Sequence, residues 1–247
     1  MRDLENTRAC RLLSHALGPF DPVTARHDPR LMRAATFYID VLSFAHTHPD
    51  RDDIQLAWAR YANQAARTYY TVANPTRHHI ADMYARVCTR QGLTFDAAIT
   101  RRRELTAYTT YGPAEDIPHA WRELAVALHA DGQCAEAHSQ IQEAFTYWKH
   151  TDVPAQPTGG QLLSTYAGIL AGCGDTDAAH TLLRDHTYLV AVPGTDQRAT
   201  AAFITAVQIA VAEREHPPVC TLLPQREPPP EADRWQGWQA VLLPSRS

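Results

Sequence analysis

The sequence lacks long hydrophobic runs and paired cysteine motifs. No stretch approaches the roughly 18 apolar residues that a membrane span requires, and the charged N-terminus contains no apolar run of signal-peptide length. An odd number of cysteines without any CxxC spacing argues against a secreted disulfide framework or a zinc cluster. The cysteines are Cys10, Cys88, Cys134, Cys173 and Cys220. We therefore expect a soluble cytoplasmic protein whose thiols are reduced and packed.

Motifs of the common enzyme classes are also missing. The chain has no GxSxG elbow, no glycine-rich phosphate loop, no dinucleotide fingerprint and no HExxH. Residues 46–50 have the H-x-H-x-D spacing of a metallohydrolase loop, but Arg51 follows where such enzymes place histidine, so we interpret Asp50 as a helix cap. His78 and His79 are adjacent and would point in different directions on a helix. The sequence thus predicts no catalytic residue, no metal site and no cofactor.

Positive charge is not in excess. The net charge is −4, with 27 acidic and 23 basic residues, which gives no basis for direct nucleic-acid binding. The densest basic run is Arg101, Arg102 and Arg103, and no aromatic residues alternate with it. We interpret this run as a solvated helix face paired with Glu104. An anion-binding patch shared with Arg86 and Arg90 is the alternative.

Helical spacing is the dominant pattern that is present. Hydrophobic residues make up 45% of the chain, enough for a packed core, and no period-two alternation competes with the helical steps. Asp28-Pro29 and Asn74-Pro75 are typical helix starts. The predicted helices cover residues 3–17, 29–45, 54–69, 75–91, 95–111, 118–131, 134–148, 160–173, 175–188, 195–215 and 231–243. The sequence thus predicts an all-α fold.

Three helix pairs align on the glycines between their helices. Gly92, Gly132 and Gly174 stand 40 and then 42 residues apart. Each pair has one alanine on its first helix and one facing it on the second, which allows the two backbones to approach closely. These alanines are Ala85, Ala125 and Ala167 on the first helices, and Ala98, Ala137 and Ala179 on the second. The chain therefore contains an internal helical repeat.

This pattern resembles the tetratricopeptide repeat (TPR), whose signature is W-x2-L-G-x2-Y followed by A-x3-F. The middle copy carries the resemblance best, through Trp121, Leu124, Ala125, Leu128, Ala137 and Ile141. Alanine replaces the signature glycine, the spacing exceeds the usual repeat length of about 34, and Arg102 occupies an apolar position of the first copy. The resemblance covers residues 75–190, and 28–215 in outline. It implies a right-handed α-α superhelix of about four to five helix pairs.

The expected organisation has three parts. Residues 1–27 form an N-terminal helix and a connection, and residues 28–215 form the TPR-like repeat domain. Residues 216–247 form a proline-rich linker and a capping helix that carries Trp235 and Trp238. A terminal repeat leaves an apolar face, which such a helix can cover.

The resemblance also implies that the first helices of the pairs line a concave groove. The residues placed there are His79, Asp82, Arg86, Arg90, His119, Arg122 and His129, followed by Gln161, Ser164 and Gly168 in the third copy. Arginine forks suit carboxylates, so we expect a peptide with acidic residues or a free C-terminus. The Lys/Asn set with which chaperone-binding members hold a C-terminal carboxylate is absent. The alternative is that these residues form ordinary solvated helix faces.

The function that follows is that of a non-catalytic scaffold or adaptor that binds a protein or peptide. Two alternatives remain: a peptide-responsive regulator that acts on transcription through a partner, and an enzyme or biosynthetic accessory protein with a pocket inside the superhelix. We expect no direct contact with nucleic acid and none with a membrane. A homodimer is left open.

Overall fold

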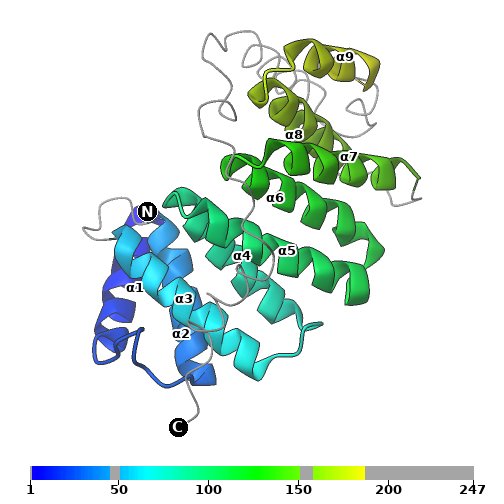
Figure 1. Cartoon of the computed structure of the whole chain (residues 1–247). Helices are drawn as coiled ribbons and strands as arrows, with labels where there is room; N and C mark the ends of the chain where they lie inside the picture. Colours follow the sequence, from blue (N-terminus) through cyan, green and yellow to red (C-terminus); the bar gives the residue numbers. More distant parts are fainter. Residues whose placement is uncertain (1, 45–50, 151–157, 187–247) are drawn as a thin grey trace.

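The computed structural model describes residues 2–44, 51–150 and 158–186. This part of the chain consists of helices joined by turns, and it contains no strand (Figure 1). The helices are α1 (Arg2–Leu17), α2 (Pro29–Phe44), α3 (Arg51–Tyr69), α4 (Pro75–Arg90), α5 (Thr94–Tyr111), the short 3-10 helix η1 (Ala114–Asp116), α6 (Ile117–Ala130), α7 (Cys134–His150), α8 (Thr158–Gly172) and α9 (Thr176–His186). The predicted all-α fold is confirmed.

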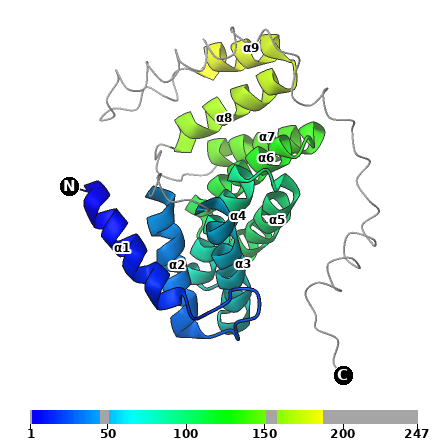
Figure 2. The ribbon, with the colours of Figure 1, turned by 90° about the vertical axis from the view of Figure 1, so that its left-hand side faces the viewer.

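The helices stack in chain order. Each one packs against the next, and α6 also contacts α8. The pairs α2–α3, α4–α5, α6–α7 and α8–α9 follow one another from one end of the molecule to the other, with α1 laid against α2 (Figure 2). The handedness of the superhelix and the three-part division of the chain stay predictions. The loop 46–50, the helices expected at 195–215 and 231–243, and the tryptophan cap lie outside the described residues.

Side-chain caps begin two of the helices where the sequence predicts them. Asp28 Oδ1 accepts hydrogen bonds from the backbone N–H groups of Arg30 (2.7 Å) and Leu31 (3.0 Å). Asn74 Oδ1 accepts one from Thr76 N–H at 2.9 Å. Each cap satisfies N–H groups that have no partner within the helix. These starts fix where α2 and α4 begin.

The three turn glycines adopt the same left-handed conformation. The φ angles of Gly92, Gly132 and Gly174 are 71°, 78° and 90°. In each turn the residue after the glycine donates its N–H to a carbonyl five residues earlier, as Leu93 does to Cys88 at 2.9 Å. This arrangement satisfies the last carbonyls of the first helix and favours a residue without Cβ. The predicted alignment on these glycines is confirmed.

The interior of the repeats is built on the predicted small residues. Ala125, Ala137 and Ala179 are completely buried, and so is Ala167. Leu124, Leu128 and Ile141 pack around the alanines of the middle pair, and none is more than 2% exposed. One apolar cluster runs from Cys10 in α1 to Leu183 in α9. The repeat thus rests on close helix contact rather than on large side chains.

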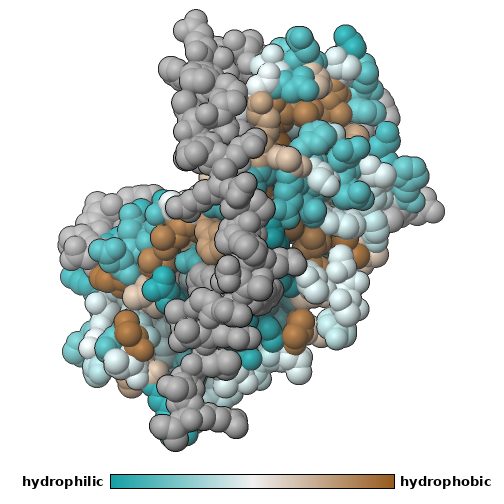
Figure 3. Space-filling view, in the orientation of Figure 1, coloured by the Kyte–Doolittle hydropathy of each residue, from teal (hydrophilic) through white to brown (hydrophobic). Residues whose placement is uncertain are grey.

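The outer surface is mixed. Several large apolar residues are exposed, among them Leu12, Phe20 and Phe37, and on the face shown in Figure 3 apolar residues form separate patches among hydrophilic ones. Among the helices that the structure describes, none combines the length and the apolar character that a membrane crossing demands.

Candidate functional site

A cavity opens on the face formed by the first helices α4 and α6, which we call the first-helix cavity. Its volume is about 250 Å³, and its floor is the intervening helix α5. It is lined by Pro75, His78, His79, Asp82, Arg101, Glu104, Tyr108, His119, Ala120 and Glu123. Three residues predicted for the groove, His79, Asp82 and His119, therefore come together here.

An alternating chain of charges passes through this cavity, which is lined by its three central members, Asp82, Arg101 and Glu123. Arg86 Nη2 lies 2.7 Å from Asp82 Oδ2, and Asp82 Oδ1 lies 2.6 Å from Arg101 Nη1. Arg101 Nη2 then lies 3.1 Å from Glu123 Oε2. The other oxygen of that carboxylate, Glu123 Oε1, accepts a hydrogen bond from Arg122 Nη2 at 2.5 Å. Three arginines and two carboxylates leave a net charge of +1. Arg86 and Arg122, both predicted groove residues, form the two ends of the chain.

Arg101, at the centre of this chain of charges, lies in a different environment from the one that the sequence predicts. Arg101 was expected on a solvated face, but it is 6% exposed and bridges α4 to α6. Arg102 points to α7, where it pairs with Glu136, and Arg103 lines a different opening. The reason is that α5 is packed between α4 and α6, so consecutive side chains, about 100° apart around the helix, meet different neighbours. A run that looks uniform in sequence is divided among three environments.

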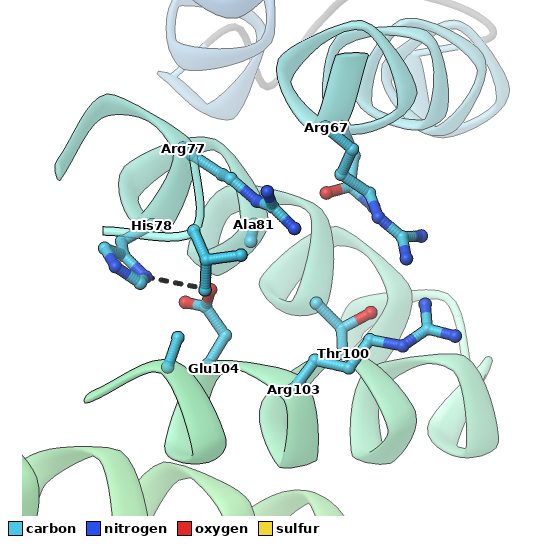
Figure 4. A pocket seen from close by; sticks show the side chains of 10 residues that line it. Arg67, Arg77, His78, Ala81, Thr100, Arg103 and Glu104 are labelled. Atoms are coloured by element: carbon cyan, nitrogen blue, oxygen red, sulfur yellow. Dashed lines mark hydrogen bonds and ion pairs between the residues drawn. The ribbon is translucent and has the colours of Figure 1, made fainter. Parts of the chain in front are cut away.

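A buried polar pair closes the inner wall of the cavity. His78 Nδ1 lies 3.3 Å from Glu104 Oε1, and both side chains are about 10% exposed. The Tyr108 ring stacks on the His78 ring with a centroid distance of 4.6 Å. Figure 4 shows the contact between His78 of α4 and Glu104 of α5. The ring and the carboxyl therefore hold each other in place.

Burial decides the protonation of this pair. It raises the pKa of the Glu104 carboxyl to about 8, against the opposing effect of Arg101. Burial also lowers the pKa of His78, and the charge of Arg77 lowers it further. Both shifts favour the uncharged forms near pH 7. A protonated carboxyl beside a neutral imidazole can donate or accept a proton.

Two predicted groove residues lie elsewhere. Arg90 Nη2 donates to Gln55 Oε1 at 3.1 Å, and Gln55 is a buried residue of α3 whose amide nitrogen donates to Ile39 O at 2.8 Å. Arg90 thus completes a hydrogen-bond network inside the preceding pair. His129, at the end of α6, lies beside Cys134 and Cys173 instead of in the cavity.

The group around His129 has the residue types of a metal site. One ligand atom each of His129, Cys134 and Cys173 lies within 4.8 Å of the others. Cys134 is disulfide-bonded, whereas Cys10, Cys88 and Cys173 are reduced. A disulfide sulfur does not supply the thiolate that zinc binds. The expectation that the thiols are reduced holds for Cys10, Cys88 and Cys173 and is wrong for Cys134.

Sequence reasoning missed several residues of the first-helix cavity: His78, Arg101, Glu104, Tyr108 and Glu123. A signal for two of them was present. Arg101 and Glu104 stand four and seven residues after the buried Ala97, at positions that continue its helical stripe. Charged residues on a stripe that is otherwise buried indicate a polar interior.

Comparison with known proteins supports the fold. No protein family profile matches the chain, and no curated protein sequence matches it. Two solved structures of a Podosopora anserina protein, described as kinesin light chain nearly identical TPR-like repeats, superpose with TM-scores of 0.65 and 0.62. The first, a point variant, has 14% sequence identity and covers 77% of this chain and 89% of its own; the second has 15% and covers 86% and 91%. The chain therefore has a TPR-like helical repeat fold.

Proposed function

We propose that this chain is a non-catalytic adaptor that binds a peptide segment in the first-helix cavity. The observation that carries the proposal is the alternating chain of charges from Arg86 to Arg122, whose net charge is +1. Its central members Asp82, Arg101 and Glu123 line the cavity, and its two terminal arginines pair with Asp82 and Glu123 from outside that lining. Its two terminal arginines each have only one carboxylate partner within the chain of charges. A guanidinium can contact two carboxylates at once. We therefore expect the ligand to present one carboxylate, from an acidic side chain or a C-terminus.

The surroundings suit a peptide better than a small rigid ligand. His79 and His119 are exposed at the rim and offer ring nitrogens to peptide groups. Trp121, half-buried on the same helix as His119, makes an edge-to-face contact with Tyr147 of α7 at a centroid distance of 5.3 Å. The repeat fold itself presents an extended surface of this kind. Protein or peptide binding is thus the function that the fold and the cavity support best.

The test is fluorescence polarisation with labelled peptides that carry acidic residues, each made with a free and with an amidated C-terminus. We expect saturable binding to a subset of them and a loss of at least tenfold in the double variant Arg86→Glu/Arg122→Glu, since each substitution adds like charge facing the ligand. Arg8→Glu/Arg184→Glu, with the same charge change on α1 and α9, should bind normally. Unchanged affinity in the first double variant, with its helicity intact by circular dichroism, would refute the assignment of the cavity.

A second candidate is an enzyme, and one observation favours it. Glu104 combines burial, a raised pKa and a histidine partner at the wall of a cavity, which is how general acids are arranged. The expected result is turnover of a model ester panel that is abolished in Glu104→Gln and retained in Glu115→Gln, whose side chain is exposed. Absence of turnover with all substrates, together with peptide binding that survives Glu104→Gln, favours the adaptor.

A further inference from the structure

The glycine turns of the middle and third copies of the repeat bring sulfur groups together. His129 and Cys134 lie on either side of the turn at Gly132, one near the end of α6 and the other at the first residue of α7. Cys173 comes directly before Gly174 in the next turn. Because α8 packs against both α6 and α7, the two turns lie side by side. Three side chains from two helix pairs therefore meet at this point.

These three side chains are close enough to react with one another. The two Sγ atoms and one ring nitrogen of His129 all lie within 4.8 Å of each other, and all three residues are half-buried. Cys134 is in a disulfide and Cys173 is a thiol. The partner in that disulfide lies outside the described residues, because Cys10 and Cys88 are reduced as well. A disulfide sulfur thus has both a thiol and a base beside it.

The other two thiols have different surroundings. Cys88 is completely buried, and burial raises the pKa of its thiol to about 11. Cys10 is also buried, and burial raises its pKa in the same way. The nucleophile in thiol chemistry is the thiolate, so thiols of this kind react slowly near pH 7. Cys173 differs from both in its greater exposure and in the imidazole and the sulfur next to it.

We propose that Cys173 and His129 form a thiol–disulfide exchange site that acts on the disulfide of Cys134. A ring nitrogen of His129 takes the proton of the Cys173 thiol, and the resulting thiolate attacks Cys134 Sγ. The Cys173–Cys134 bond forms as the bond from Cys134 to its former partner breaks. The electron pair of the broken bond leaves with the partner's sulfur, which takes up the proton from His129. One thiol and one disulfide enter the step and one of each leave it, so no oxidant or reductant is consumed.

The helix termini favour the negative charge that this step requires. In the transition state of an exchange, the charge is spread over the attacking, central and leaving sulfurs. The central sulfur belongs to the first residue of α7, a helix of 17 residues, and the N-terminus of a helix carries partial positive charge. The acidic side chains of the two turns have donors of their own. Asp131 Oδ1 accepts from Thr94 Oγ1 at 2.7 Å, and Asp175 Oδ1 accepts from Ala178 N–H at 3.0 Å.

Exchange moves a cross-link from one place in the protein to another. The new bond joins the start of α7 to the residue after α8, so it ties the middle helix pair to the next one. The former partner of Cys134 is released at the same time. This proposal does not depend on peptide binding, because His129 is near the end of α6, whereas the first-helix cavity is lined by residues from the first half of that helix.

The test is disulfide mapping by mass spectrometry on the full chain, purified without reductant and stored at about pH 5, where thiols are protonated. After a jump to about pH 7.5, samples are quenched with acid and alkylated. We expect a peptide pair linked through Cys134 and Cys173 to accumulate, while the total number of thiols titrated in denaturant stays constant. Cys173→Ser should give no such pair. Cys10→Ser removes a thiol distant from the site and should behave as the wild type does.

His129→Ala tests the base. At about pH 7.5 the initial rate of exchange should fall roughly tenfold or more, because the variant has no group that accepts the thiol proton. At about pH 9.5, above the ordinary thiol pKa of about 8.5, a thiol ionises unaided and the two rates should converge. A purely structural role of the ring predicts the same deficit at both pH values.

Four results would overturn the proposal. One is a folded wild-type protein that never forms the Cys134–Cys173 pair. Another is linkage of Cys134 to Cys10 or Cys88 at the same rate, since disulfides would then be scrambled in an opened chain. A loss of two thiols for each new pair would mean that an external oxidant forms the bond. A rate deficit of His129→Ala that persists at the higher pH would remove the base from the site. Thermal unfolding of each variant separates loss of exchange from loss of fold.

Discussion

The pair α4–α5 buries charged side chains at the level where the pair α6–α7 buries apolar ones. In α6–α7 the interior consists of Leu124, Ala125 and Ile141, each at most 2% exposed. In α4–α5 the alanines Ala85 and Ala98 are equally buried, but Arg101, Glu104 and His78 are buried beside them. The two alanine positions therefore suffice to pack one pair, and the neighbouring positions can carry polar groups when partners from adjacent helices meet them.

The largest expected effect tests the apolar pair. Ala125→Trp inserts a large ring at a helix contact that has no space, and overpacking of this kind should lower the free energy of unfolding by about 3 kcal/mol or more. Urea denaturation followed by circular dichroism measures it. Val126→Trp, one position along and 41% exposed, serves as the control and should change stability little. Equal effects at both positions would contradict the packing described for α6.

A smaller loss is expected in the polar pair. Arg101→Met removes the bridge between Asp82 and Glu123 and leaves both carboxylates without it. Because these carboxylates are 29% and 22% exposed, water offsets part of the cost, and we expect a loss of about 2 kcal/mol. A double-mutant cycle with Glu123→Gln measures the coupling. Strictly additive effects would show that the bridge contributes nothing.

The third prediction concerns pH. The pKa of Glu104 is about 8 in the folded chain, above its ordinary value of 4.5, so the folded state holds a proton that the unfolded state has released. This contribution to stability is complete below pH 4.5 and is lost as pH rises to about 8, with a steepest slope of about 1.4 kcal/mol per pH unit. The lowered pKa of His78 acts in the opposite direction, because that contribution is lost as pH falls below about 6.5.

The difference in the free energy of unfolding between wild type and Glu104→Gln reports the contribution of the Glu104 carboxyl alone. Glutamine keeps the size and cannot ionise, so the stability of wild type relative to the variant should fall steadily between pH 5 and pH 8. Urea unfolding at intervals of one pH unit measures this difference. A flat difference would mean that Glu104 is ionised in the folded chain. Gln142→Glu, an exposed site on α7, should add no such dependence.

The fourth effect concerns the glycine turn, which has the same conformation in both pairs. Gly92 has a φ of +71°, and a Cβ added to it would meet no atom within 4 Å. The cost of Gly92→Ala is therefore backbone strain alone, about 1 kcal/mol, measured as a shift in the urea midpoint. Gly92→Asn should lose less stability than Gly92→Ala, since asparagine tolerates this backbone conformation better than alanine does.

The smallest effect is expected at the end of the charge chain. The Arg86 side chain is 58% exposed and pairs with Asp82 one helical turn away. Arg86→Ala should change stability by less than about 0.5 kcal/mol, while peptide affinity, measured by fluorescence polarisation, should fall. A stability loss as large as that of Arg101→Met would show that the chain of charges is a structural unit throughout.

Local sequence patterns were enough to predict the repeat, but they did not predict the contacts between helix pairs. The glycine turns at Gly92 and Gly132 and the caps at Asp28 and Asn74 depend on residues a few positions apart, so the sequence contains them in full. The burial of Arg101 depends on carboxylates from two other helices, nineteen residues before it and twenty-two after it.

The same limit applies to the two groove residues that the structure places elsewhere. Arg90 shares its helix with Asp82 and Arg86, but its end of α4 meets Gln55 of the preceding pair. His129 shares α6 with Arg122, but it lies beside Cys173, the residue that follows the end of α8. Position within a repeat predicts the face of a helix, and the neighbours at each end of that helix decide what the face contacts.

The His78–Glu104 pair borders two openings: the first-helix cavity and a smaller one that Arg67, Arg77 and Arg103 also line. These two titratable side chains therefore form the wall that the two openings share. An ion held on either side changes the proton affinity of that pair, and by thermodynamic reciprocity the protonation of the pair changes the affinity for the ion. Binding of an ion in one opening would in this way be linked through a proton to binding in the other.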